Sequence, residues 1–174
     1  PGDGSLLCVT PVTGGLTNRI DTTATVELGA AGVLDLGTNT YSQTLANLRG
    51  SGIVSNGVLA VTGYIDPGGT NAVGWLTVAN SSGLAGKLRM DVAMDGTSDR
   101  LVVVGNINLS SLSLEIANPA QLNKQQPYKV VTCTGTRTGA FSAVTVPSPH
   151  WHVFYSPDGS VKLIYVNGTL ISLL

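Results

Sequence analysis

Three aspartates, Asp91, Asp95 and Asp99, recur at every fourth residue of one short polar segment. Clustered carboxylate oxygens are the ligands that a hard cation such as Ca²⁺ takes. Their spacing matches no calcium-binding loop, however, and Asp95-Gly96 is a residue pair that bends a chain. The sequence therefore favours a polar turn with its bend at Asp95-Gly96, in which Asp99 accepts hydrogen bonds from backbone amides.

Two histidines, His150 and His152, flank Trp151. On a strand they share one face, but a zinc site needs three or four ligands and no third ligand lies nearby in sequence. We expect a solvent-facing pair beside a packed tryptophan, and no bound metal or cofactor.

Carboxylates for glycoside hydrolysis would have to form a pair at a defined separation. No local spacing selects such a pair, and no Ser/His/Asp or Cys/His set is identifiable. We therefore expect a non-catalytic protein, with a carbohydrate-active enzyme as an open alternative. The aspartates that this alternative would recruit are Asp35, Asp66, Asp91 and Asp99.

Trp75 is the residue that we single out for ligand binding. It lies in Gly74-Trp75-Leu76-Thr77-Val78, where strand alternation places it opposite Leu76 and Val78 and hence on an outer face. An exposed indole stacks on sugar rings, so an adhesin or glycan-binding module is the second functional alternative. An aromatic ring that covers a neighbouring part of the fold is the structural alternative.

Cys8 and Cys133 lie far apart in the sequence. Two free, buried cysteines that behave as small apolar residues, a disulfide, and a thiol nucleophile are the three alternatives. Secreted scaffolds that depend on disulfides use many more cysteines.

Charged residues make up 11% of the chain, against the roughly 25% of ordinary globular domains. The nine lysines and arginines are scattered singly and the net charge is -1, so nothing indicates nucleic-acid binding. No apolar run reaches the ~20 residues of a membrane helix, so we expect no direct membrane insertion. Hydrophobic residues still make up 43%, enough for a core under a Thr-, Ser-, Asn- and Gly-rich surface. This composition favours an extracellular β-protein, and the opening residues indicate an excised part of a longer precursor.

Apolar residues alternate at period 2 through most of the chain, which predicts short strands with one buried face. A theme of Gly-x-Leu-x-(Leu/Val) recurs about every 17 to 25 residues, a spacing typical of a solenoid. We predict an all-β fold, a parallel β-helix, with an immunoglobulin-like sandwich as the alternative. The predicted inward-facing residues are Leu59, Val61, Leu76, Val78, Leu88, Leu101 and Val103.

The amino-acid composition changes towards the C-terminal end, where aromatic residues and prolines are enriched. We divide the chain into β-helix coils at 1–124 and a capping element of the same solenoid, built from antiparallel hairpins, at 125–174. A solenoid needs such a cap because its open end is an unpaired edge that templates aggregation. Pro119–Gln126 is expected to be a polar loop or a single helical turn.

Several segments, in this order, resemble the C-terminal region of autotransporter passenger domains, which is built of autotransporter-associated β-strand repeats. They are Val33–Gly37, Leu45–Gly52, Asn56–Gly63, Asp66–Gly69, Ser98–Gly105, Tyr128–Val131, Gly139–Ser142 and the Trp151–Leu163 hairpin. The resemblance implies a right-handed β-helix exported by Gram-negative bacteria to the cell surface or beyond it. It also implies a stalk whose C-terminal part promotes folding of the passenger, with activity in other domains. The expected partner is the remainder of a longer parent chain, with self-association through coil edges as an alternative.

Overall fold

The fold consists of parallel β-strands arranged in two large sheets. The computed structural model describes residues 6–8, 17–37, 41–79 and 81–168. One sheet has eight strands in spatial order: β1 (Leu6–Cys8), β3 (Val33–Asp35), β5 (Ile53–Ser55), β7 (Trp75–Ala79), β10 (Arg100–Val104), β13 (Tyr128–Cys133), β17 (Val161–Tyr165) and β16 (Trp151–Tyr155). We call this the eight-stranded sheet.

The second sheet has seven strands. Its order is β15 (Ala143–Thr145), β12 (Leu112–Ile116), β9 (Gly86–Met90), β6 (Val58–Pro67), β4 (Ser42–Gly50) and β2 (Thr25–Leu28), and β8 (Ser81–Leu84) also pairs with β6. A small third sheet pairs β11 (Ile107–Asn108) with β14 (Arg137–Thr138). The predicted single turn is confirmed as a 3-10 helix, Pro119–Gln121.

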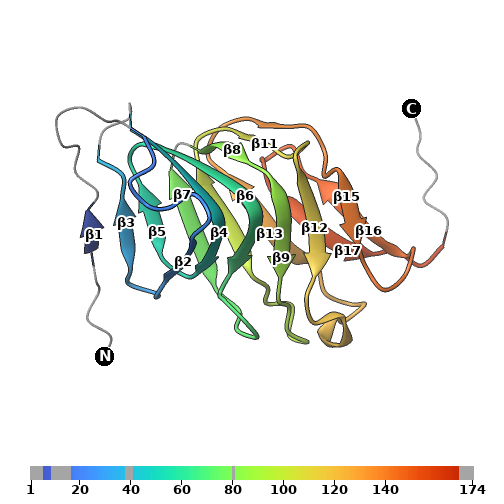
Figure 1. Cartoon of the computed structure of the whole chain (residues 1–174). Coiled ribbons are helices and arrows are strands. Elements are labelled where there is room, and N and C mark those ends of the chain that lie inside the picture. Colours follow the sequence, from blue (N-terminus) through green and yellow to red (C-terminus); the bar gives the residue numbers. More distant parts are fainter. Residues whose placement is uncertain (1–5, 9–16, 38–40, 80, 169–174) are drawn as a thin grey trace.

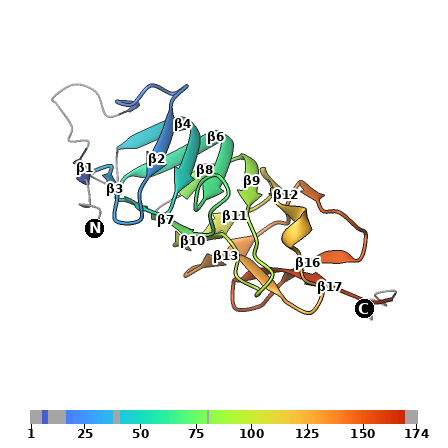
Figure 2. The same ribbon diagram turned by 90° about the horizontal axis from the view of Figure 1, so that it is seen from below.

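The chain alternates between the two large sheets as it advances. Strands β1 to β7 fall in turn on one sheet and then on the other, and Figure 2 shows the two sheets as two rows. Their colours run from blue to red along the same direction in Figure 1. We call one passage of the chain away from a sheet and back to it a circuit. Paired residues in neighbouring strands are one circuit apart in sequence: Tyr64 lies 17 residues after its partner Asn47, whereas Thr132 lies 30 residues after Val102. An immunoglobulin-like sandwich is antiparallel, so that alternative is wrong.

Inward-facing side chains of successive strands stack in rows. Leu76, Leu101 and Val131 occupy matching positions of β7, β10 and β13, and each is fully buried. The alternation of buried and less buried residues along each strand follows from the pleat, which directs successive side chains to opposite faces. The structure buries all seven residues that the sequence places inward: Leu59, Val61, Leu76, Val78, Leu88, Leu101 and Val103.

Glycine is required where neighbouring circuits approach closely. Gly50 and Gly86 both have a positive φ, of 106° and 83°. A Cβ at Gly50 would collide with the carbonyl oxygen of Leu28, and one at Gly86 with that of Gly63. These two positions therefore need glycine for both the backbone conformation and the space.

The C-terminal end departs from the parallel pattern. Strand β17 pairs antiparallel with β13 on one side and with β16 on the other. Rings gather beneath this hairpin: Trp151 lies 6.0 Å from Tyr128 and 5.2 Å from Tyr165 between ring centres. The hairpin therefore adds two antiparallel strands to an otherwise parallel sheet and covers its end with aromatic side chains.

A row of alternating charges crosses the outer face of the seven-stranded sheet. Its order over five strands is Glu27, Arg49, Asp66, Arg89 and Glu115. The Arg49 guanidinium donates to Glu27 at 3.0 Å, and Arg89 lies 3.6 Å from both Asp66 and Glu115. An exposed pair such as Arg49–Glu27 contributes only about 0–1 kcal/mol. We infer that this ladder acts mainly on register, because a slipped strand would separate the opposite charges that face each other in the native pairing.

Burial along β10 predicts unequal effects of two truncations. Replacing the fully buried Leu101 by Ala leaves a cavity in the core and should lower the free energy of unfolding by about 2–5 kcal/mol. Val104 lies on the same strand but is 47% exposed, so Val104→Ala should change it by less than about 0.5 kcal/mol. Urea denaturation measures both, and equal effects would contradict the inward orientation of Leu101.

Candidate functional site

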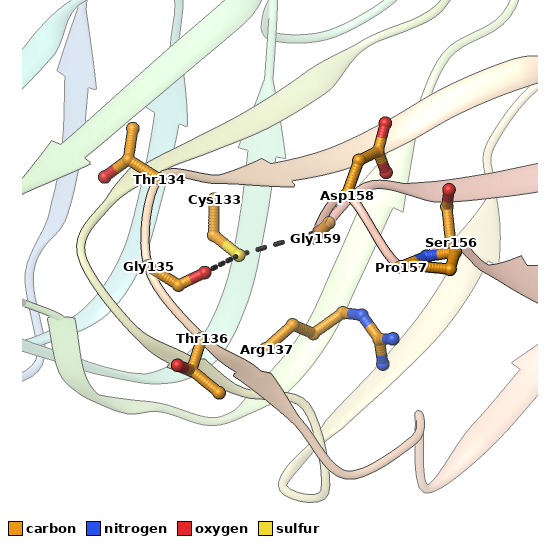
Figure 3. A pocket seen from close by; sticks show the side chains of 9 residues that line it. All are labelled: Cys133, Thr134, Gly135, Thr136, Arg137, Ser156, Pro157, Asp158 and Gly159. Carbon is orange, nitrogen blue, oxygen red and sulfur yellow. Dashed lines mark hydrogen bonds between the residues drawn. The ribbon is translucent and has the colours of Figure 1, made fainter.

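A polar pocket of about 370 Å³ lies near the C-terminal end, between the loop that follows β13 and the turn between β16 and β17 (Figure 3). Strand β13 ends at Cys133, and the chain passes through Gly135 before β14 begins at Arg137. The full lining is Cys133, Thr134, Gly135, Thr136, Arg137, Ser156, Pro157, Asp158 and Gly159. Hydroxyls, one thiol, one guanidinium and one carboxylate therefore share this recess.

The thiol of the pocket is held as a hydrogen-bond donor. Cys133 Sγ donates to the carbonyl oxygens of Gly135 at 3.3 Å and of Gly159 at 3.6 Å. Burial raises the pKa of this thiol, so it stays protonated at neutral pH. The thiolate is the nucleophilic form of cysteine, and no histidine lines the described pocket to generate it. The geometry favours a structural thiol.

The two charged groups of the pocket both contact neighbouring residues, although Arg137 Nε is buried without a hydrogen-bond partner among the described residues. Asp158 accepts hydrogen bonds from the Ser160 hydroxyl at 2.6 Å and the Ser160 backbone N–H at 2.9 Å, which hold the pKa of that carboxyl well below its usual range. The Arg137 guanidinium lies 4.9 Å from the ring centre of Tyr155, and its Nη1 donates to Gly139 O at 3.4 Å. Asp158 is thus an ionised turn residue, and the pocket offers polar contacts rather than an acid–base pair.

The sheet order separates the two cysteines. Cys8 lies on β1 and Cys133 on β13, five strand steps away in the same sheet. Five steps amount to about 24 Å, whereas a disulfide requires Cα atoms within about 7 Å. A disulfide within one chain is therefore excluded. The side chain of Cys8 lies outside the described residues.

A second polar cluster is buried among the turns that connect strands of the two large sheets. Asp66, Asp91 and Asp99 are each at most 2% exposed. Asp66 lies near the end of β6, Asp91 directly follows β9, and Asp99 directly precedes β10. The fold therefore brings together three carboxylates that are separated by up to 33 positions in the chain.

Asp99 ties these turns together. Its Oδ1 accepts from the Gly74 N–H and its Oδ2 from the Asp91 N–H, both at 2.7 Å. Burial raises the pKa of Asp99 to about 8, and the charges of Asp91 and Asp66 add to the rise against these two hydrogen bonds. Burial also raises the pKa of Asp66, opposed by the Arg89 guanidinium. Asp91 Oδ1 is buried with no hydrogen-bond partner. The cluster is a polar clamp between circuits.

The polar turn predicted for this segment is confirmed. Asp95 is exposed and accepts from the backbone N–H and the hydroxyl of Thr97, the chain bends at Gly96 with a φ of 92°, and Asp99 accepts from backbone amides. Asp95 thus faces away from the buried pair Asp91 and Asp99. Across the described residues, no group of three or more His, Cys, Asp or Glu side chains is arranged to hold a metal ion.

The histidine pair packs against the hairpin. The ring of His150 lies 5.6 Å from that of Tyr165, and His152 pairs with Ile164 across β16 and β17. Trp75, the residue proposed for ligand binding, is 55% exposed on the outer face of the eight-stranded sheet. The guanidinium carbon of Arg100 lies 4.4 Å from its ring centre. Trp75 is therefore one half of a stacked pair from neighbouring strands.

Sequence reasoning missed that Asp66 joins Asp91 and Asp99. The available signal was weak: each aspartate lies next to a strand end, but the lengths of the circuits decide which ends meet. Comparison with known proteins finds no matching family model and no significantly similar curated protein. Among the described residues, no helix is long and apolar enough to cross a membrane.

The raised pKa of Asp99 predicts an unusual pH dependence. The folded protein keeps a proton that the unfolded chain releases at an ordinary pKa of 3.8, so this contribution to stability is complete below that pH and is lost as the pH rises to about 8. The slope should reach at most about 1.4 kcal/mol per pH unit. Asn at position 99 cannot titrate. The free energy of unfolding of Asp99→Asn should therefore rise relative to that of the wild type as the pH increases from about 5 to about 9.

Asp95→Asn is the matched control in the same turn. Asp95 is exposed and hydrogen bonds from Thr97 lower its pKa, so it stays ionised over that whole range. Its difference from the wild type should be constant. Urea denaturation at several pH values measures all three proteins, and a constant difference for Asp99→Asn would contradict the raised pKa.

Proposed function

We propose that this chain is a structural stalk and folding-promoting segment of an exported bacterial surface protein, and that it has no catalytic activity of its own. The observation that carries the proposal is the continuous parallel stacking of strands in two large sheets, with an antiparallel hairpin at the C-terminal side. Such a stack lengthens by repetition of one unit, which is the property that a stalk needs.

The strands wind, in this proposal, as a right-handed parallel β-helix. Each strand of the eight-stranded sheet from β1 to β7 is followed by a strand of the other sheet before the chain returns, parallel, one step further along. Connections between parallel strands of one sheet are right-handed in about 98% of cases. The resemblance to autotransporter passenger domains supports the same handedness.

The remainder of a longer parent chain would continue the stack at its other end. Strands β1 and β2 are the terminal strands of their sheets in the described part of the molecule. Their outward edges present backbone N–H and C=O groups that a further strand can pair. The low charge content and the polar, uncharged surface support export to the cell surface of a Gram-negative bacterium.

Side-chain chemistry supports a structural role. The Cys133 thiol is bound to two carbonyl oxygens, Asp158 to Ser160, and Asp99 to two backbone amides. These three groups hold turns or join neighbouring circuits, which supports a structural use of their side chains.

The hairpin is the part of the fold that can form first. Strands β16 and β17 are joined by a five-residue turn, so their pairing closes a short loop, whereas each parallel pairing closes a loop of roughly one circuit. Shorter loops cost less entropy and form faster. Trp151 and Tyr165 of the hairpin then offer a surface on which Tyr128 of β13 can pack.

Two leucines at opposite ends of the eight-stranded sheet test this order of folding. Leu163 on β17 and Leu34 on β3 are both fully buried. Leu163→Ala should slow refolding, with a φ-value of about 0.5 or more, whereas Leu34→Ala should mainly speed unfolding, with a φ-value near zero. Stopped-flow fluorescence in urea measures both rates. Equal φ-values, or a higher value for Leu34, would contradict a folding-promoting role of the C-terminal end.

A further inference from the structure

Five outward-facing side chains form one row across the eight-stranded sheet. Trp75 on β7 pairs with Arg100 on β10, Lys129 on β13 pairs with Lys162 on β17, and Lys162 pairs with Phe154 on β16. The two halves join where Arg100 Nε donates to the Lys129 carbonyl oxygen at 3.4 Å. The row thus reads aromatic, cation, cation, cation, aromatic over five adjacent strands, and spans about 19 Å at the usual strand spacing.

The three cations of this row are not held in ion pairs within the described residues. In the part of the chain that the structure describes, Arg100, Lys129 and Lys162 form no ion pair with a carboxylate. Asp158, whose pKa is lowered mainly by Ser160 and least by Lys162, makes no ion pair with that lysine. On the outer face of the other sheet, every neighbouring charge of the ladder alternates in sign.

Folding alone does not explain the arrangement. Lys129 and Lys162 lie directly opposite each other on antiparallel strands, where like charges are destabilising. Both are half-buried, which keeps their charges close to the sheet surface. Three neighbouring cations without an ion pair among the described residues, in a chain with only nine lysines and arginines, indicate a partner of opposite charge.

The ends of the row indicate what else the partner carries. Trp75 is 55% exposed and Phe154 is 47% exposed, although both are large apolar side chains on an otherwise polar surface. Exposed aromatic rings beside charged groups are typical of sites that stack flat, partly apolar rings. These ends would suit a partner that carries flat, partly apolar rings beside its negative charges.

We propose that this row binds an acidic polysaccharide that carries carboxylate groups, with its carboxylates over Arg100, Lys129 and Lys162 and sugar rings on Trp75 and Phe154. An extended oligosaccharide is long enough to cross the about 19 Å of the row, so carboxylates along it can reach the cations while its rings reach the aromatic ends. A single-stranded nucleic acid is disfavoured because its sites interleave aromatic and basic residues, whereas here the rings lie only at the ends. This binding is independent of the proposed role as a stalk.

The test uses the full chain and a fluorescently labelled oligogalacturonate long enough to cross five strands. Fluorescence anisotropy at low ionic strength should show saturable binding that weakens as salt is added, because charge attraction is screened. The methyl-esterified oligomer keeps the rings but loses the charges, and it should bind at least about tenfold more weakly.

Matched variants locate the site. Lys129→Gln/Lys162→Gln should weaken binding at least about tenfold and flatten the salt dependence. Lys87→Gln/Lys124→Gln removes the same charge away from the row and should leave affinity within about twofold. Trp75→Ala should weaken binding, and the emission of the exposed Trp75 should shift to shorter wavelength when the wild type binds, a shift absent from Trp75→Phe.

Stability is measured in parallel, so that loss of binding is not confused with unfolding. Removing the facing lysines relieves their repulsion, and the double variant should be at least as stable as the wild type in urea. Three results would each overturn the proposal: no binding of the charged oligomer, equal losses in the two double variants, or equally tight binding of a single-stranded oligothymidylate.

Discussion

Parallel register is the constraint on which the rest of this structure depends. Because side chains alternate between faces, a slip of one residue between β7 and β10 would turn Leu76, Leu101 and their neighbours out of the core together. The stacked leucines and valines therefore do more than contribute hydrophobic free energy. They also decide which outward residues of successive circuits become neighbours, and so determine the charge ladder, the aspartate clamp and the cation row.

Local patterns were predictable from the sequence, and pairings between circuits were not. Strand alternation alone places Leu76 and Val78 inward and Trp75 outward, because that orientation depends only on adjacent residues. Which strands lie side by side depends on the length of each circuit, and this varies from 16 residues between Ser42 and Val58 to 30 between Val102 and Thr132. The lysines and arginines accordingly look scattered in sequence, although three of them share one row.

The carboxylates of the charge ladder and of the aspartate cluster have different neighbours. Arg89 lies between Asp66 and Glu115, so each carboxylate at the surface ladder faces a guanidinium. Asp99 lies a short way inward, where the neighbouring charges are those of Asp91 and Asp66 and only backbone amides offset them. Desolvation without a cation favours the neutral acid. Asp99 is thus a hydrogen-bonding device that joins the turn after β6 to the turn between β9 and β10.

Stacking also turns sparse sequence features into linear arrays. One outward residue per circuit becomes, after folding, a row with a repeat of about 4.8 Å, a spacing that no short peptide motif in a loop would hold. On the seven-stranded sheet the row alternates in sign and neutralises itself. On the eight-stranded sheet the row carries one sign only and is bounded by exposed rings. A scaffold needs the first arrangement alone, so the second is the part of this molecule whose chemistry is directed outward, towards a polymer of opposite charge.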